Sequence, residues 1–135
     1  MAIQLSTTVR NARLDAIETA IGVSAVLKIF TGTVPANCAA ANSGTVLATV
    51  NCPSDYMNAA SSGSKTKNGT WEDTSADNTG TAGHFRLYAS DGTTCHLQGT
   101  VTATGGGGDM TVDNTSFASG QTFTVTTFTL SDANA

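Results

Sequence analysis

The sequence predicts a mainly β protein: a jelly roll or β-sandwich of seven to eight short antiparallel strands with one N-terminal amphipathic helix. Three observations support this fold class. Short stretches rich in β-branched and aromatic residues alternate with hydroxyl residues at period two, turn residues separate them, and helical spacing of apolar residues occurs only before Gly22. At 135 residues the chain is long enough for one domain. We expect an N-terminal arm and helix over residues 1–22 and a single β-sandwich domain over residues 23–135.

The helix is expected to begin after the hydroxyl residues Ser6-Thr7-Thr8 and to end at Gly22. Its apolar residues are spaced three and four apart, which produces one apolar stripe that needs a partner. Two alternatives remain open: the stripe packs on the chain's own sheet, or it docks on a neighbouring subunit. In the second case the partner-binding residues are expected to be Arg10, Arg13, Leu14, Ile17 and Ile21.

The strands follow the helix at short intervals. They are expected at residues 23–31, 45–51, 70–72, 84–89, 95–101, 110–112 and 122–130, with polar loops at 33–44, 59–69 and 73–83. The Asp91-Gly92 turn predicts an antiparallel hairpin between residues 84–89 and 95–101. The alternation predicts two faces, a buried one with Phe85, Leu87 and Ala89, and a polar, solvent-facing one with His84, Arg86 and Tyr88.

The last strand changes its buried face partway along. Phe123 and Val125 share one parity, whereas Phe128 and Leu130 share the other. We therefore predict a bulge or bend near Thr126-Thr127, of the kind that lets a strand turn a corner.

The run of four glycines at residues 105–108 suggests a phosphate-binding loop at first sight. No Gly-Lys-Ser/Thr or Gly-x-Gly-x-x-Gly pattern accompanies it, and no helix is expected after it. We interpret it as a flexible or tightly turned connection between strands.

The charge pattern disfavours several classes of partner. The net charge is −4, and no lysine or arginine cluster occurs. Nucleic-acid binding and polybasic membrane contacts both depend on such clusters, so we expect neither nucleic acid nor membrane as a partner. With no basic leader and no long apolar span in this sequence, we expect synthesis and folding in a cytoplasm.

Residues that could carry chemistry are few. His84 and His96 would lie near one another on the polar face of the hairpin, but the spacing defines no third metal ligand. The acidic residues of the β region lie in or next to turns, where aspartate binds its own backbone; they are Glu72, Asp73, Asp77, Asp91, Asp109 and Asp113. We therefore predict no catalytic residue, no metal and no cofactor. The three cysteines, Cys38, Cys52 and Cys95, form an odd set at wide spacings and are expected to be reduced and mostly buried.

Four stretches of the chain together carry a resemblance to a known protein type. They are residues 9–22 (Val-Arg-Asn-Ala-Arg-Leu-Asp-Ala-Ile-Glu-Thr-Ala-Ile-Gly), 35–41 (Pro-Ala-Asn-Cys-Ala-Ala-Ala), 80–88 (Gly-Thr-Ala-Gly-His-Phe-Arg-Leu-Tyr) and the glycine-rich tail 99–135. Together they resemble a small protein type that recurs in tailed bacteriophages and prophages, and the resemblance covers most of the chain. The expected fold is also similar to the small jelly-roll cement proteins of phage heads. No functional residues are carried over, because this analogy provides none to match.

The resemblance implies a phage setting, and the protein type generally carries no assigned activity. Together with the compact acidic β-domain and the lack of a credible active site, this setting favours a virion structural protein. The leading hypothesis is a capsid decoration or cement protein on the outer surface of the capsid. Its expected partners are the major capsid protein and further copies of itself, as a dimer or trimer, and the helix stripe and exposed strand edges are the expected contacts. One alternative is a tail or head-tail junction accessory protein, such as a receptor- or glycan-binding knob, favoured if Tyr56, Trp71 and Tyr88 form an aromatic patch. Another is an enzyme such as a cell-wall hydrolase, although we expect no enzymatic activity.

Overall fold

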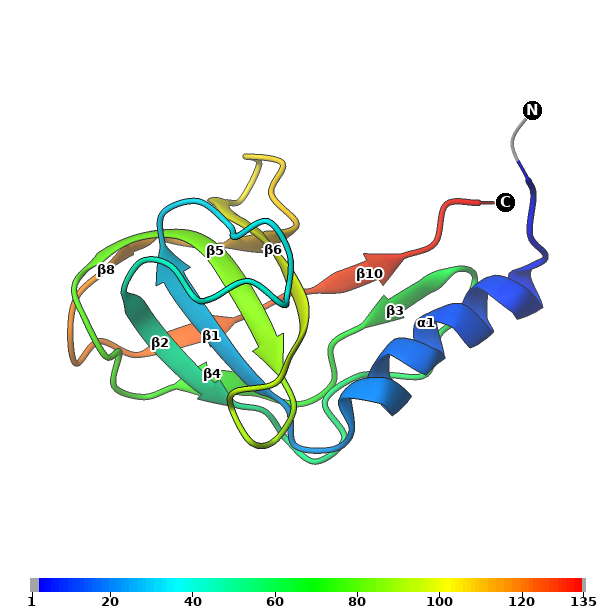
Figure 1. The fold of residues 1–135 in the computed structure, drawn as a ribbon, viewed down its shortest axis with the longest axis horizontal. Helices are drawn as coiled ribbons and strands as arrows, with labels where there is room; N and C mark the ends of the chain where they lie inside the picture. The colour runs from blue at the N-terminus through cyan, green and yellow to red at the C-terminus, as the bar shows by residue number, and fades with distance from the viewer. Residues whose placement is uncertain (1–2, 135) are drawn as a thin grey trace.

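The computed structural model describes residues 3–134 and shows a β-rich head from which a narrow arm projects (Figure 1). The arm consists of α1 (Thr7–Ile21), β3 (Ser64–Thr66) and β10 (Thr129–Ser131). The head contains β1 (Val26–Thr31), β2 (Val46–Asn51), β4 (Trp71–Asp73), β5 (Gly80–Tyr88), β6 (Cys95–Ala103), β7 (Met110–Val112), β8 (Ser116–Phe117) and β9 (Phe123–Val125). The predicted class, mainly β with one N-terminal helix, is confirmed.

The largest sheet, called the main sheet below, has the strand order β2-β1-β5-β6-β7, and β8 pairs with the start of β5. Neighbouring strands are antiparallel except β6 and β7, which run parallel. The sequence analysis expected antiparallel strands only, so this pair is a correction. Two small antiparallel sheets complete the fold, β4 with β9 in the head and β3 with β10 in the arm.

The hydrophobic core lies between the main sheet and the β4–β9 pair. Leu27 and Leu87 of the main sheet belong to the same buried cluster as Trp71 of β4 and Val125 of β9. Phe128, which follows β9, has its ring centroid 5.7 Å from that of Trp71. The break between β9 and β10 falls over residues 126–128, where the sequence predicted a bend. This bend carries the last part of the chain from the head into the arm (Figure 1).

The other face of the main sheet is also buried, which corrects the prediction that it faces water. Arg86 is 2% exposed and donates hydrogen bonds to the backbone oxygens of Asn37 and Ala40 and to the side chain of Asn42. These acceptors belong to the loop over residues 33–44, which therefore lies across the sheet as a cover. Tyr88 adds a hydrogen bond of 2.8 Å from its hydroxyl to Asn42 Oδ1.

A disulfide bond between Cys38 and Cys95 fastens the same loop to the start of β6. The expectation that all three cysteines are reduced is therefore wrong for this pair. Cys38 and Cys95 are separated by 57 residues, so sequence spacing alone did not pair them. Cys52 is free and buried, as predicted, and burial raises the pKa of its thiol to about 12.

Local expectations agree with the structure in most places. The Asp91-Gly92 turn joins β5 and β6 as an antiparallel hairpin, and the helix begins after Ser6, whose hydroxyl accepts a hydrogen bond from the N–H of Val9. The four glycines connect β6 to β7. Several boundaries differ: α1 begins at Thr7 and not after Thr8, β1 begins at Val26 and not at residue 23, and β5 begins at Gly80 within a predicted loop. Neither β3 nor β8 was expected.

Candidate interaction surface

Ion pairs from a buried lysine hold the helix of the arm against β3. Lys65, on β3, is 2% exposed, and its Nζ lies 2.7 Å from Asp15 Oδ1 and 2.7 Å from Glu18 Oε2. It also donates a hydrogen bond of 2.8 Å to the backbone oxygen of Asn58. All three protons of the ammonium group thus have acceptors, which a buried cation requires.

The contact between Lys65 and Asp15 lowers the pKa of Asp15 and raises that of Lys65. The hydrogen bond from Lys65, with a second from the N–H of Ala60, holds the pKa of Asp15 below its ordinary range. Burial alone would lower the pKa of Lys65, but the hydrogen bonds to Asp15 and Glu18 outweigh burial and raise it. The pair is therefore charged at neutral pH.

The far end of the arm joins both ends of the described chain. The N–H of Leu5 donates to the backbone oxygen of Asn134 at 2.6 Å. Asp132 makes an ion pair of 3.2 Å with Arg13, and its backbone oxygen accepts a hydrogen bond of 3.1 Å from Arg10 Nη1. The termini thus lie side by side at the tip of the arm, away from the head (Figure 1).

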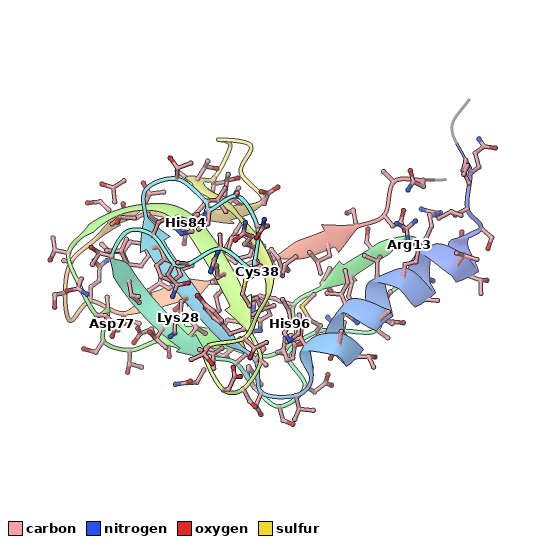
Figure 2. The ribbon with its side chains drawn as sticks, viewed as in Figure 1. Arg13, Lys28, Cys38, Asp77, His84 and His96 are labelled. Carbon is pink, nitrogen blue, oxygen red and sulfur yellow. A yellow bond between two sulfur atoms is a disulfide. The ribbon has the colours of Figure 1, made fainter. Side chains whose placement is uncertain are left out.

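The five predicted partner-binding residues all lie in the arm, and their surroundings differ. Leu14 and Ile21 are buried by the chain itself, and Ile17 packs partly buried against the core. The apolar stripe therefore packs on the chain's own elements, which was one of the two alternatives. Arg10 contacts the C-terminal segment, and Arg13 keeps 55% of its side chain exposed at the surface of the arm (Figure 2).

One edge of the arm sheet is open. The outer edge of β3 is covered, because the N–H of Asn58 donates to the oxygen of Thr66 at 2.8 Å and Ser61 forms a bridge with Ser64. β10 pairs with β3 on one side, and no other strand in residues 3–134 pairs with it. The backbone of β10 therefore has a free side that can accept another strand.

Two hollows border β10. The first, about 610 Å³, lies between α1 and the end of the chain and is lined by Arg13, Leu14, Ala16, Ile17 and residues 131–134. The second, about 290 Å³, lies between β10 and the head. Its lining residues are Phe85, Leu97, Gln98, Asp109, Phe128, Thr129, Leu130 and Ser131. We call β10 and these two hollows the edge groove.

The two histidines do not form a site. His84 pairs with Thr100 in the β5–β6 ladder, whereas His96 lies beside the opposite end of that ladder, so the predicted proximity is wrong (Figure 2). His84 is fully buried, stacks on Phe30 and has its Nδ1 2.9 Å from the backbone oxygen of Gly32. His96 is exposed. Among residues 3–134, no group of three or more His, Cys, Asp or Glu side chains could hold a metal ion.

The aromatic residues that would have favoured a glycan-binding patch are buried. Tyr56, Trp71 and Tyr88 are each no more than 1% exposed. Trp71 Nε1 donates hydrogen bonds of 3.2 Å to the backbone oxygens of Tyr56 and Asn68. These rings are core elements, and they present no aromatic surface to a sugar.

Sequence reasoning missed the elements that create the edge groove. β3 lies in a segment predicted as a polar loop, and its central residue is a lysine, which period-two reading treats as exposed. Exposed strand edges were expected as contacts, but pairing partners decide which edge stays free. The only local indication was the break at residues 126–128, which separates β10 from β9.

In the described part of the chain, no helix is both long and apolar enough to cross a membrane. Comparison with protein-family models, with curated proteins and with solved structures finds no match to this chain.

Proposed function

We propose that the protein is a structural component of a tailed bacteriophage particle, a decoration or cement protein that binds and stabilises the major capsid shell. The phage setting is supported by the sequence resemblance over residues 9–22, 35–41, 80–88 and 99–135. The assembly role is supported by one structural observation above all: an arm with an open strand edge projects from the head (Figure 1). An open edge is a ready template for a strand of another chain.

The head supports the same proposal. The main sheet and the β4–β9 pair enclose the core as two layers, which is compatible with the sandwich or jelly roll of small cement proteins. The 33–44 loop closes the other face of the main sheet through Arg86 and the Cys38–Cys95 disulfide. Disulfides persist on surfaces in oxidising surroundings, including virion surfaces. A disulfide-closed head therefore suits a protein on the outside of a particle.

The protein would stabilise the capsid shell through avidity, that is, through many weak contacts that act together. Each subunit contributes a modest interface to neighbouring capsid proteins, and many copies together resist the outward pressure of packed DNA. The net charge of −4 favours the outer surface of the shell over its DNA-facing side.

The proposal is tested on purified virions of the phage or prophage that encodes the chain. Gold-labelled antibodies against the purified protein are expected to decorate the heads, and mass spectrometry is expected to detect many copies per particle. Labelling confined to the tail or the junction would support the accessory-protein alternative. Absence of the protein from virions would overturn the proposal.

A second measurement tests stabilisation. Particles that lack the protein are heated with and without added purified chain, and DNA release is followed by dye fluorescence. The added chain is expected to raise the release temperature by several degrees. An unchanged release temperature at saturating binding would contradict the cement role.

A further inference from the structure

The free edge of β10 is short, and it carries neither the charge nor the proline that often protects an exposed strand edge. Its residues are Thr129, Leu130 and Ser131, so the strand contains neither a charged residue nor a proline. Natural proteins commonly place lysine, proline or a bulge on such edges to prevent pairing with other chains. We propose that the edge groove binds a second copy of this chain, with β10 pairing antiparallel to β10 of the second copy in a symmetric dimer.

The ladder with β3 defines which backbone groups are free. Lys67 donates to the oxygen of Phe128, and Asp132 donates to the oxygen of Gly63, so residues of this parity on β10 face β3. Leu130 has the same parity and lies opposite Lys65. In an antiparallel sheet the alternate residues point their N–H and C=O groups to the other side. Thr129 and Ser131 therefore offer two donors and two acceptors to a new strand.

Symmetry then selects a register. If Thr129 of one copy lies opposite Ser131 of the other, all four free groups of each strand are used. The two-fold axis then passes between the two Leu130 residues, and β3-β10-β10-β3 becomes one four-stranded sheet. This contact is isologous, because each copy presents the same surface to the other.

The two ends of the edge groove complement each other under this symmetry. At the tip of the arm, Ile3 is 80% exposed and Arg13 is partly exposed. At the base, the hollow beside the head is lined by the apolar residues Leu97 and Phe128 and by the acidic residue Asp109. Antiparallel pairing brings the tip of one arm to the base of the other. Ile3 of one copy thus meets the apolar side chains of that hollow, and Arg13 meets the carboxylate of Asp109.

These complementary ends favour a second copy over an unrelated partner. Three strand residues provide few hydrogen bonds, so the contacts at the two ends supply much of the interface, and each copy carries both halves of that match. The inference depends on the proposed role of the arm in assembly, but it does not depend on the phage setting.

The dimer is tested by sedimentation equilibrium of the purified full chain. The expected mass at micromolar concentration is twice the 13.6 kDa of one chain. Thr129→Pro removes an outward N–H that β3 does not use and should produce a monomer. Thr129→Val, the matched control, keeps both the N–H and the β-branched shape and should remain dimeric. A monomeric wild type, or a Thr129→Pro variant that stays dimeric, would overturn the proposal.

A cross-linking experiment tests the register independently of the proline variant. Thr129→Cys and Ser131→Cys proteins are prepared separately, mixed and oxidised; Cys52 is buried with a raised pKa and stays inert. The mixture is expected to form a cross-linked dimer that contains one copy of each variant, whereas each variant alone forms at least tenfold less. Equal cross-linking in the single-variant samples would overturn the register. Dimers that form normally but do not bind capsids would contradict the proposed function and leave the dimer established.

Discussion

The hydroxyl oxygen of Thr102 accepts a hydrogen bond of 2.9 Å from the N–H of Gly108, and this contact closes the connection between two parallel strands. Parallel neighbours usually need a crossover of about a dozen residues or more. Here the chain leaves β6 at Ala103 and enters β7 at Met110. The glycines make this short return possible, because a Cβ at Gly106 or at Gly108 would lie within 3 Å of Thr102 atoms.

Gly108→Ala should therefore destabilise the protein. The added Cβ would lie 2.8 Å from Thr102 Oγ1 and 2.9 Å from Thr102 N, and the backbone nitrogen cannot move aside cheaply. We expect a loss of about 1–3 kcal/mol in the free energy of unfolding, measured by urea denaturation. Gly107→Asn is the control, since Gly107 has space around it and asparagine tolerates its positive φ of 80°. Equal losses in the two variants would contradict the close-contact explanation.

Lys65 should contribute to the stability of the arm through its stem as well as its charge. Lys65→Ala removes the buried stem and the contacts to Asp15 and Glu18, and we expect it to cost about 2–4 kcal/mol. Lys65→Met keeps most of the stem, so it should cost clearly less in the same denaturation experiment. A Met variant as unstable as the Ala variant would show that charge alone holds the helix.

The Asp15 carboxylate should make stability depend on acid pH. Its pKa in the folded protein lies below the ordinary value of 3.8. Its contribution is thus fully present above that value and is lost as the pH falls through the lower folded pKa. We expect the stability difference between wild type and Asp15→Asn to be constant from pH 7 to about pH 5 and to shrink below about pH 4. A difference that grows as the pH falls would contradict this assignment.

Reduction of the Cys38–Cys95 disulfide should loosen the loop that covers the main sheet. The bond closes a span of 57 residues, and we expect its loss to cost about 2–4 kcal/mol. Thermal unfolding with and without dithiothreitol measures the effect, and Cys95→Ser should lower the melting temperature to the reduced value. Cys52→Ala should remain as sensitive to reductant as the wild type. If dithiothreitol leaves the melting temperatures of both the wild type and Cys52→Ala unchanged, the bond does not stabilise the fold.

Local patterns predicted the local parts of the fold. We predicted a helix start near the hydroxyl residues 6–8, a helix end at Gly22 and a β5–β6 hairpin at Asp91-Gly92, because each depends on residues a few positions apart. The bend after Val125 followed from a change of parity within one strand. Such features need no knowledge of the rest of the chain.

The parts that were missed depend on contacts between distant segments. Lys65 can be buried only because Asp15 and Glu18 lie opposite it, about fifty positions earlier in the chain. Arg86 is buried because loop oxygens more than forty positions away accept its protons. For the candidate surface, exposed strand edges could be anticipated as a class. The sequence could not show that β10 carries the free edge, because this depends on which segments pair with β3 and β10.

The meeting of Leu5 and Asn134 at the tip of the arm has a mechanical consequence. Tension applied across these two residues would reach the arm first and peel β10 from β3 one bond at a time, like a zipper. The head would bear load only afterwards, and its Cys38–Cys95 crosslink would keep the enclosed residues from extending. The arm would thus unfold at a lower force than the head.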